Sequence, residues 1–190
     1  MKQRPADASD AELLGSSLAG DVKAFTAVIA RHETGVHGYL ARRAGYAAAE
    51  DLLSEVWLAA FRARGSYDPS WPNARPWLFG IARNILRTHQ RRDHRNLPAA
   101  SGVLDLWPEV DERLEGAALV KAAVLGLPVD ERDVLLLVVW EQLTPTEAAI
   151  VLGIPSGTAR GRLHRARIAI RGDLAYRAEA AAQRSKGEAS

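Results

Sequence analysis

Apolar positions recur at helical spacing along most of this chain, and the alternation typical of strands is scarce. The 47–64 segment shows the pattern best, and its predicted buried face contains Leu52, Leu53, Val56, Trp57, Ala60 and Phe61. Leucine, alanine and arginine dominate the sequence, and all three favour helices. We therefore predict an all-α fold.

Capping residues and helix breakers predict where the helices begin and end. Asp21 is expected to cap a helix that stops at Gly45, and Asn73 to cap another that reaches about Arg92. Further helices are predicted at 117–125, 130–140, 144–152 and 155–174. Between the second and third helices lies a stretch rich in Gly, Pro and Ser, residues 65–72, which we call the 65–72 loop.

The stretch 96–115 contains Pro98, Gly102 and Pro108 and is typical of a linker. It divides the chain into two small helical domains, predicted at 1–95 and 116–175. The last residues, 176–190, are expected to be a frayed tail.

A helix-turn-helix is predicted in the second domain. Thr144-Pro145-Thr146-Glu147 forms a capping box with proline at the first helical position, and Gly153 ends this short helix. The longer helix that follows is basic, which completes the signature. A helical wheel places one narrow apolar stripe on it, made of Ala159, Leu163, Ala166 and Ile170.

The opposite side of that helix has the composition of a surface that reads DNA. Gly157 and Gly161 lie on this side together with arginines, so the backbone can lie close to a major-groove floor. Arg160 is predicted to bind guanine through two hydrogen bonds, and the residues better placed for phosphates are Arg162, Arg167 and Arg171. A solvated basic helix is the alternative interpretation.

The helix after the 65–72 loop has a second basic face. Its apolar side contains Ala74, Leu78, Ile81, Ala82 and Ile85, and its polar side contains Arg83, Asn84, Arg87 and Arg91. Trp77, Trp71 and Tyr67 lie nearby. Arginines interleaved with aromatic rings are suited to single-stranded nucleic acid, although core packing is the simpler explanation for Trp77 and Phe79.

The net charge of +2 hides two basic blocks. Residues 75–95 hold six arginines against one aspartate, and so do residues 151–177, whereas the stretch between them is acidic. Two such blocks on separate domains favour a polyanion that is bound at two places.

Several classes of function are disfavoured. The chain has no cysteine, which excludes disulfides and a thiol nucleophile. Its longest run without Asp, Glu, Lys or Arg is 148–159. This run contains two glycines and a proline and is too short to span a membrane. No signal peptide is visible, so a cytoplasmic location is expected. Metal-ligand spacings, Walker A loops and nucleophile motifs are absent from the sequence, so we expect no cofactor, no metal and no enzyme activity. The carboxylates Glu50, Asp51 and Glu55 have no histidine partner and suggest a protein-contact or solvated face.

Two groups of motifs occur in the order found in a known family. Residues 49–58 (Ala-Glu-Asp-Leu-Leu-Ser-Glu-Val-Trp-Leu), Tyr67-Asp68-Pro69 and 77–84 (Trp-Leu-Phe-Gly-Ile-Ala-Arg-Asn) resemble conserved region 2 of the extracytoplasmic-function (ECF) sigma factors. Leu127-Pro128 and the 144–171 helix-turn-helix resemble region 4 of the same family. The resemblance covers roughly residues 21–95 and 117–173.

The resemblance implies an RNA polymerase specificity subunit, whose region 2 melts and reads the −10 element and whose region 4 reads the −35 element. It implies that Glu50, Asp51 and Glu55 meet core RNA polymerase and that the 65–72 loop with Asn84 holds a flipped −10 base. The candidate residues for single-stranded −10 DNA are Ser66, Tyr67, Asp68, Arg83, Asn84, Arg87 and Arg91. Those for double-stranded −35 DNA are Ser156, Thr158, Arg160, Arg162, His164 and Arg165. An anti-sigma factor is an optional further partner.

Some positions depart from the family pattern. Ser54 stands where glutamine is common, and Arg75-Pro76 replaces non-proline residues. Ala159 and Gly161 are smaller than the usual residues, which leaves the −35 sequence unpredicted.

Two other functions fit parts of the sequence. A stand-alone helix-turn-helix transcriptional regulator would need to dimerise, and no heptad seam or apolar dimer helix is visible. A helical RNA-binding regulator is compatible with the arginines and aromatics of 67–95, but the groove helix of the second domain argues against it. Co-purification with core polymerase separates the sigma factor from both.

Overall fold

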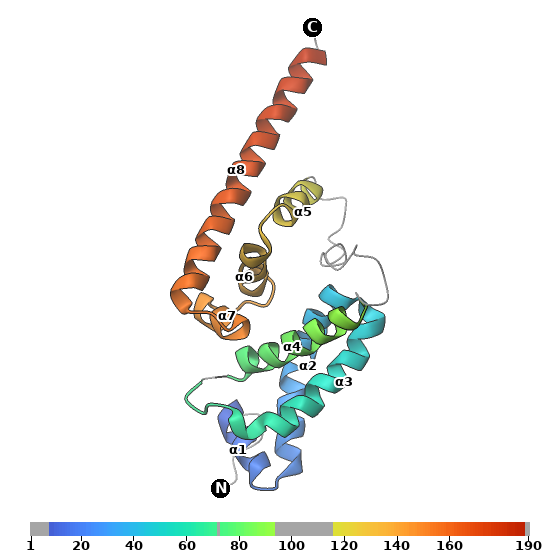
Figure 1. Cartoon of the computed structure of the whole chain (residues 1–190), viewed down its shortest axis with the longest axis vertical. Coiled ribbons are helices and arrows are strands. Elements are labelled where there is room, and N and C mark those ends of the chain that lie inside the picture. Colours follow the sequence, from blue (N-terminus) through green and yellow to red (C-terminus); the bar gives the residue numbers. More distant parts are fainter. Residues whose placement is uncertain (1–7, 72, 94–115, 189–190) are drawn as a thin grey trace. The chain divides into compact units, whose positions relative to one another are not determined.

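The structure is a computed structural model and describes residues 8–71, 73–93 and 116–188. Within these ranges the elements are eight α-helices and one short 3-10 helix, without a strand, so the prediction of an all-α fold is confirmed (Figure 1). The chain divides into two compact units, Met1–Leu106 and Trp107–Ser190, in agreement with two helical domains. The predicted 96–115 linker lies outside the described residues.

The first unit is a helical bundle built around α2. Its elements are α1 (Asp10–Leu18), α2 (Val22–Ala44), α3 (Tyr46–Ala63), the 3-10 helix η1 (Arg64–Ser66) and α4 (Arg75–Asp93). Helix α2 packs against α1, α3 and α4. Gly45 adopts a φ of 77°, which a glycine reaches without strain, and separates α2 from α3 as predicted. The core contains Leu14, Val28, Leu40, Val56, Leu78 and Phe79.

Helix α1 was not predicted, although the sequence contains a signal for it. The Ser9 hydroxyl accepts a hydrogen bond from the Glu12 N–H, and the Glu12 carboxylate accepts one from the Ser9 N–H, which is a complete capping box. The helix has nine residues, and its glycine and two serines are poor helix formers. Burial of Leu13 and Leu14 against the bundle outweighs that low propensity.

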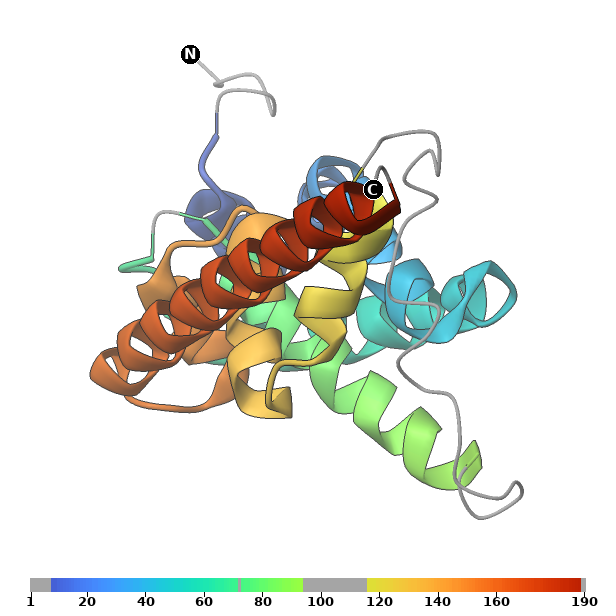
Figure 2. The same ribbon diagram turned by 90° about the horizontal axis from the view of Figure 1, so that it is seen from above.

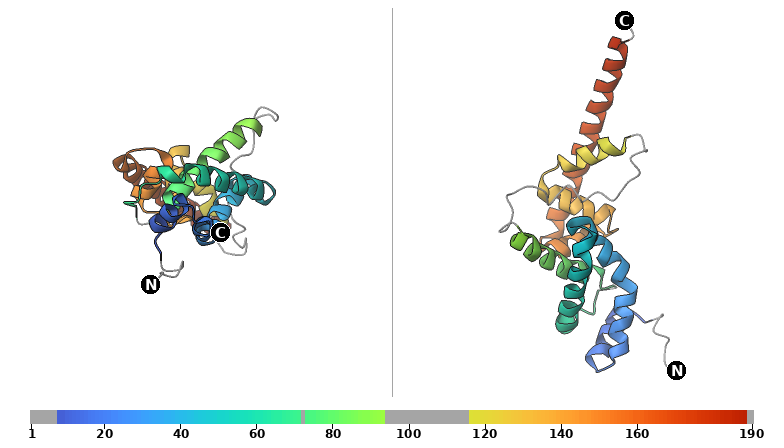
Figure 3. Two further views of the ribbon diagram at one scale, coloured as in Figure 1. Left: turned by 90° about the horizontal axis from the view of Figure 1, so that it is seen from below. Right: turned by 90° about the vertical axis from the view of Figure 1, so that its right-hand side faces the viewer.

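The last turns of α4 stand clear of α2 and α3 (Figures 2 and 3). Arg87 and Arg91 lie in this part of the helix and are exposed. The basic end of α4 is therefore open to a ligand.

The second unit consists of α5 (Ala117–Leu125), α6 (Val129–Val139), α7 (Pro145–Leu152) and α8 (Ser156–Glu188). Its core contains Val124, Leu127, Val134, Leu136, Ala149 and Leu163. Helix α8 continues well past its predicted end near Leu174 and extends beyond the other helices of its unit (Figures 1 and 3). The prediction of a frayed tail from residue 176 is thus wrong as far as Glu188, because the alanine-rich sequence there contains no helix-breaking proline.

Candidate nucleic-acid interface

The helix-turn-helix of the second unit has the predicted local geometry. The Thr144 hydroxyl accepts a hydrogen bond from the Glu147 N–H at 3.2 Å, and Glu147 Oε2 accepts one from the Thr144 N–H at 2.8 Å. Pro145 is the first residue of α7. Gly153 has a φ of 67°, a left-handed conformation that lets the chain turn directly into α8. The capping box and the glycine turn together fix how α8 leaves α7.

Helix α8 has one buried stripe and one exposed basic side, as the helical wheel predicted. Ala159 and Ala166 are fully buried, Leu163 is 4% exposed, and Ile170 packs against the same core. On the other side the exposed candidate residues are Thr158, Arg160, His164 and Arg165, whereas Ser156 and Arg162 are half-buried. A Cβ added to Gly157 would meet nothing within 4 Å, so packing inside the unit does not explain this glycine.

Two of the arginines are held by the start of α6. Arg162 Nη2 lies 2.5 Å from Asp130 Oδ2, and Arg165 Nε lies 2.7 Å from Glu131 Oε1. Sequence reasoning treated the basic helix and the acidic segment separately and missed these pairs, because their partners are 32 and 34 positions apart. Arg160 is exposed on the same basic side of α8. The acidic first turn of α6 therefore holds two arginines of this basic side in place.

In the first unit, the 65–72 loop contains one buried candidate residue, Tyr67, and two exposed ones, Ser66 and Asp68. Tyr67, predicted to contact DNA, is only 8% exposed; its hydroxyl donates to the Trp71 carbonyl at 2.9 Å, and its ring meets the edge of Trp77 at 5.6 Å between centroids. The ring therefore anchors the loop in the free chain, and the DNA contact predicted for Tyr67 stays a prediction.

Both exposed residues also shape the loop. The Ser66 hydroxyl donates to the Ala63 carbonyl at 2.7 Å, and Asp68 Oδ1 accepts from the Ser70 N–H at 2.9 Å. Hydrogen bonds from the Ser70 backbone and hydroxyl lower the pKa of Asp68. The loop is thus closed by its own polar groups, with little apolar burial besides Tyr67.

Helix α4 carries the remaining candidates along one side. Trp77, Asn84 and Arg91 are spaced by seven residues, which is nearly two full turns, so they share a face. Because Tyr67 packs on Trp77, the 65–72 loop lies at one end of the line that leads to Asn84 and Arg91. Asn84, Arg87 and Arg91 are exposed, and Arg83 is half-buried. The core alternative is correct for Phe79, which is 1% exposed.

The carboxylates of α3 form an exposed patch. Glu50, Asp51 and Glu55 are exposed, and the buried side of the helix consists of Ala49, Leu52, Val56 and Ala60. Leu58, which is 51% exposed, lies two turns after Asp51. We call Glu50, Asp51 and Glu55 the acidic patch. An exposed apolar side chain beside them has the character of a protein interface more than of a uniformly solvated face.

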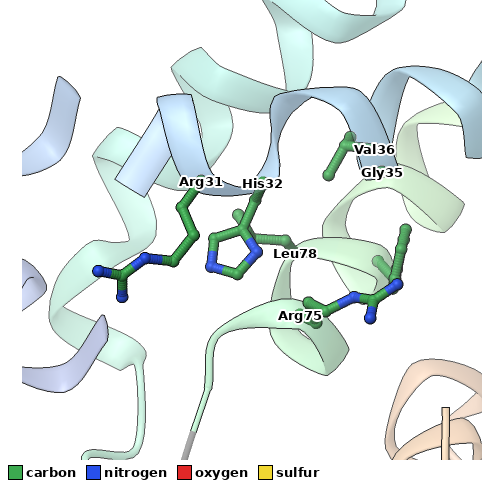
Figure 4. A pocket seen from close by; sticks show the side chains of 7 residues that line it. Arg31, His32, Gly35, Val36, Arg75 and Leu78 are labelled. Carbon is green, nitrogen blue, oxygen red and sulfur yellow. The ribbon is translucent and has the colours of Figure 1, made fainter. Parts of the chain in front are cut away.

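Asp10 is a functional candidate that sequence reasoning missed altogether. Its carboxylate is 2% exposed and accepts from Arg31 Nη1 at 2.5 Å, from His32 Nε2 at 2.7 Å and from the Ala74 N–H at 2.7 Å. Arg31 and His32 lie side by side on α2, whereas Arg75 lies on α4 and its guanidinium points away from Arg31 (Figure 4). Arg31, His32 and Arg75 line a pocket of about 290 Å³ between α2 and α4, but the two arginines do not point toward one place in it.

The surroundings of Asp10 shift its pKa and predict an acid-sensitive fold. Burial alone would raise the pKa, but hydrogen bonds from His32 and the Ala74 N–H, together with the His32 charge and Arg31, lower it to about 2. A depressed pKa stabilises the folded chain above the unfolded value near 4, and this contribution is lost as the pH falls through 2. We expect Asp10 to account for about 2 kcal/mol of the free energy of unfolding.

Urea denaturation between pH 6 and pH 2 measures this contribution as the difference between the wild-type chain and Asp10→Asn. The two curves of unfolding free energy should converge as the pH falls. Parallel curves would contradict the assignment.

In the part of the chain that the structure describes, no helix is long and apolar enough to cross a membrane. No group of three or more His, Asp or Glu side chains in those residues is arranged to hold a metal ion.

Comparison with known proteins identifies the family. Residues 28–96 match sigma-70 region 2, and residues 117–170 match sigma-70 region 4. The ECF RNA polymerase sigma factor SigM of Mycobacterium tuberculosis is 32% identical, over 88% of this chain and 86% of SigM. The RNA polymerase sigma factor CarQ of Myxococcus xanthus is 34% identical, over 77% of this chain and 86% of CarQ.

A solved structure of another sigma factor has a similar fold. The structure of CnrH in complex with the cytosolic domain of CnrY matches with a TM-score of 0.63 and 26% identity, over 88% of this chain and 97% of CnrH. Two family regions in the right order, a helix-turn-helix with a basic outer side and relatives similar over most of their length lead to one conclusion: the chain belongs to the ECF sigma factors of RNA polymerase, which recognise promoters and initiate transcription.

Proposed function

We propose that this sigma factor reads promoters at two separate surfaces and binds core polymerase through a third. The exposed side of α8 reads double-stranded −35 DNA. The 65–72 loop and the Asn84 side of α4 capture the unstacked −10 strand, and the acidic patch of α3 binds the polymerase. The observation that carries the proposal is Arg160, which is exposed beside two glycines on a helix whose opposite side is buried.

The mechanism uses binding energy and no reaction catalysed by this chain. Free in solution, two small basic surfaces on separate units have no fixed spacing, so each binds DNA weakly. Core polymerase fixes the spacing and makes the second contact intramolecular, which raises its effective concentration. Strand opening then draws on captured bases and on phosphate contacts. We place this activity in the cytoplasm, together with core polymerase.

The solved CnrH structure contains the cytosolic domain of CnrY, and another sigma factor with this fold, RpoE of Bartonella quintana, was solved with the anti-sigma factor NepR. By analogy with these proteins, we propose that an anti-sigma factor binds this chain as well. A stand-alone regulator is not favoured, because region 2 would then have no role.

Transcription in vitro with core polymerase and a randomised promoter library tests the whole proposal. Transcripts should appear only when both the chain and core polymerase are present, and they should share a −10 and a −35 sequence. Transcription without a shared −35 sequence would contradict the role of α8.

Replacing Arg160 by alanine tests direct reading of the −35 element. If its guanidinium makes two hydrogen bonds to guanine, Arg160→Ala costs about 1–3 kcal/mol at one base pair. The library should then lose its preference at that position alone. Arg167→Ala is the matched control, since the loss of a phosphate contact weakens all sequences equally. An equal loss over all −35 sequences for Arg160→Ala would show that it too binds phosphate.

A further inference from the structure

Helix α1 contacts the chain on both sides of the 65–72 loop, at Gly65, its first residue, and at Ala74, two residues after its last. At the second end, Asp10 Oδ2 accepts a hydrogen bond of 2.7 Å from the Ala74 N–H, directly before α4. At the first end, α1 packs against η1, and Leu18 Cδ2 lies 3.7 Å from the position that a Cβ on Gly65 would occupy. Both ends of the loop thus rest on one nine-residue helix.

Asp10 in turn ties α1 to the bundle. Its two carboxylate oxygens accept from Arg31 and His32 on α2 as well as from Ala74, so one buried group joins three helices. Arg31 also donates to the Ala8 carbonyl at 2.9 Å and so holds the residues before α1. A buried carboxylate with several charge-assisted hydrogen bonds tolerates little displacement, because any lost partner leaves a buried polar group unpaired.

The hydrogen bonds inside the loop do not perform this task. The contacts of Tyr67 with Trp71 and of Asp68 with Ser70 shape the loop but do not connect it to α1 or α2. The internal contacts set the form of the loop, whereas Tyr67 packs it against Trp77 of α4 and α1 holds the chain on either side of it.

We propose that α1 is a positioning element for −10 recognition, in which Asp10 fixes the α4 end of the 65–72 loop and Leu18 its η1 end. This proposal rests on the proposed role of the loop in reading the −10 strand. Helix α1 lies before the match to sigma-70 region 2, which begins at residue 28, so the family comparison assigns it no role.

The decisive variant is Asp10→Asn. The side chain keeps its size but exchanges one oxygen for an NH₂ group, so at least one of the three donors loses its acceptor and Arg31 loses its counter-charge. With polymerase holoenzyme on a duplex promoter, permanganate reactivity of the −10 thymines should appear about tenfold more slowly. Affinity for core polymerase should change less than about twofold, because the acidic patch is untouched.

A matched control separates positioning from general loss of stability. Leu40 is fully buried on α2, eight residues after His32, so Leu40→Ala weakens the same bundle without touching the Asp10 contacts. Hydrogen exchange adds a readout that does not depend on transcription. Amides of residues 67–74 should exchange faster in Asp10→Asn than in Leu40→Ala, while those of α3 exchange alike.

If Asp10→Asn does not fold, Leu18→Ala replaces it, because Leu18 is 54% exposed and its loss is tolerated. It should slow opening by roughly threefold. Opening as fast in these variants as in Leu40→Ala, or unchanged exchange at 67–74, overturns the positioning role.

Asn84→Ala, assayed alongside, tests the proposed function itself. Slow opening in Asn84→Ala with normal opening in Asp10→Asn rejects only the positioning role. Normal opening in both, with faster exchange at 67–74 in Asp10→Asn, rejects −10 reading by the loop and the positioning role with it.

Discussion

Reversing the acidic patch with Glu50→Lys, Asp51→Lys and Glu55→Lys should reduce affinity for core polymerase by at least about a hundredfold. The three side chains are exposed on the side of α3 opposite its buried residues, so the fold should not change. Like charges brought together at an interface cost several kcal/mol, and three charges reverse sign in this variant, which changes the net charge by six units. Fluorescence titration of labelled chain with core polymerase measures the loss.

The control is a double variant at other sites, and it is compared with a double variant of the patch that has the same change of net charge. Glu33 and Glu179 are exposed on α2 and α8, so Glu33→Lys with Glu179→Lys matches Glu50→Lys with Glu55→Lys charge for charge. The patch pair should lose affinity steeply and the control pair slightly. Equal losses would mean that polymerase responds to net charge and that the patch is only a solvated face.

Replacing Ser66, Asp68 and Asn84 together by alanine should slow promoter opening by about a hundredfold while assembly with polymerase stays normal. Each captured base is worth about 1–3 kcal/mol, and Asn84 offers both a donor and an acceptor to a base edge. Tyr67 is left in place, because it is buried and its removal would disturb the Trp77 contact. Permanganate reactivity of −10 thymines measures opening.

A promoter that is already melted across the −10 region distinguishes opening from reading. It should restore only part of the activity of this variant, because melting is bypassed and base recognition is not. Full recovery would assign melting alone to these residues. Unchanged permanganate reactivity on the duplex would remove the 65–72 loop from −10 recognition.

Local signals predicted most of the helices and the outer side of α8, because each depends on residues within a few positions of one another. The Thr144–Glu147 capping box, Gly45 and the stripe from Ala159 to Ala166 all act over one or two turns. Helix α1 also has a local signal, the capping box of Ser9 and Glu12, but it was overlooked because the residues around it are mostly polar.

What the sequence did not predict depends on tertiary contacts. The ring of Tyr67 packs against Trp77, which lies ten positions later in the sequence. Asp10 is 64 positions from Ala74, and the partners of Asp130 and Glu131 lie 32 and 34 positions later, on α8. The pattern of residues within one segment cannot indicate a contact between two distant segments. The ion pairs and hydrogen bonds of the candidate sites were therefore seen only in the folded structure.

The place of Asp10 also determines how this sigma factor can be recombined with its relatives. A chimera joined at residue 28, where the match to region 2 begins, would transplant α4 without the carboxylate that receives its first backbone donor. His32 belongs to the transferred segment as well, and it would lose the Asp10 carboxylate as its hydrogen-bond acceptor. The smallest exchangeable module is therefore α1 through α4, inherited as one piece, and it is larger than the segment that sequence similarity marks out.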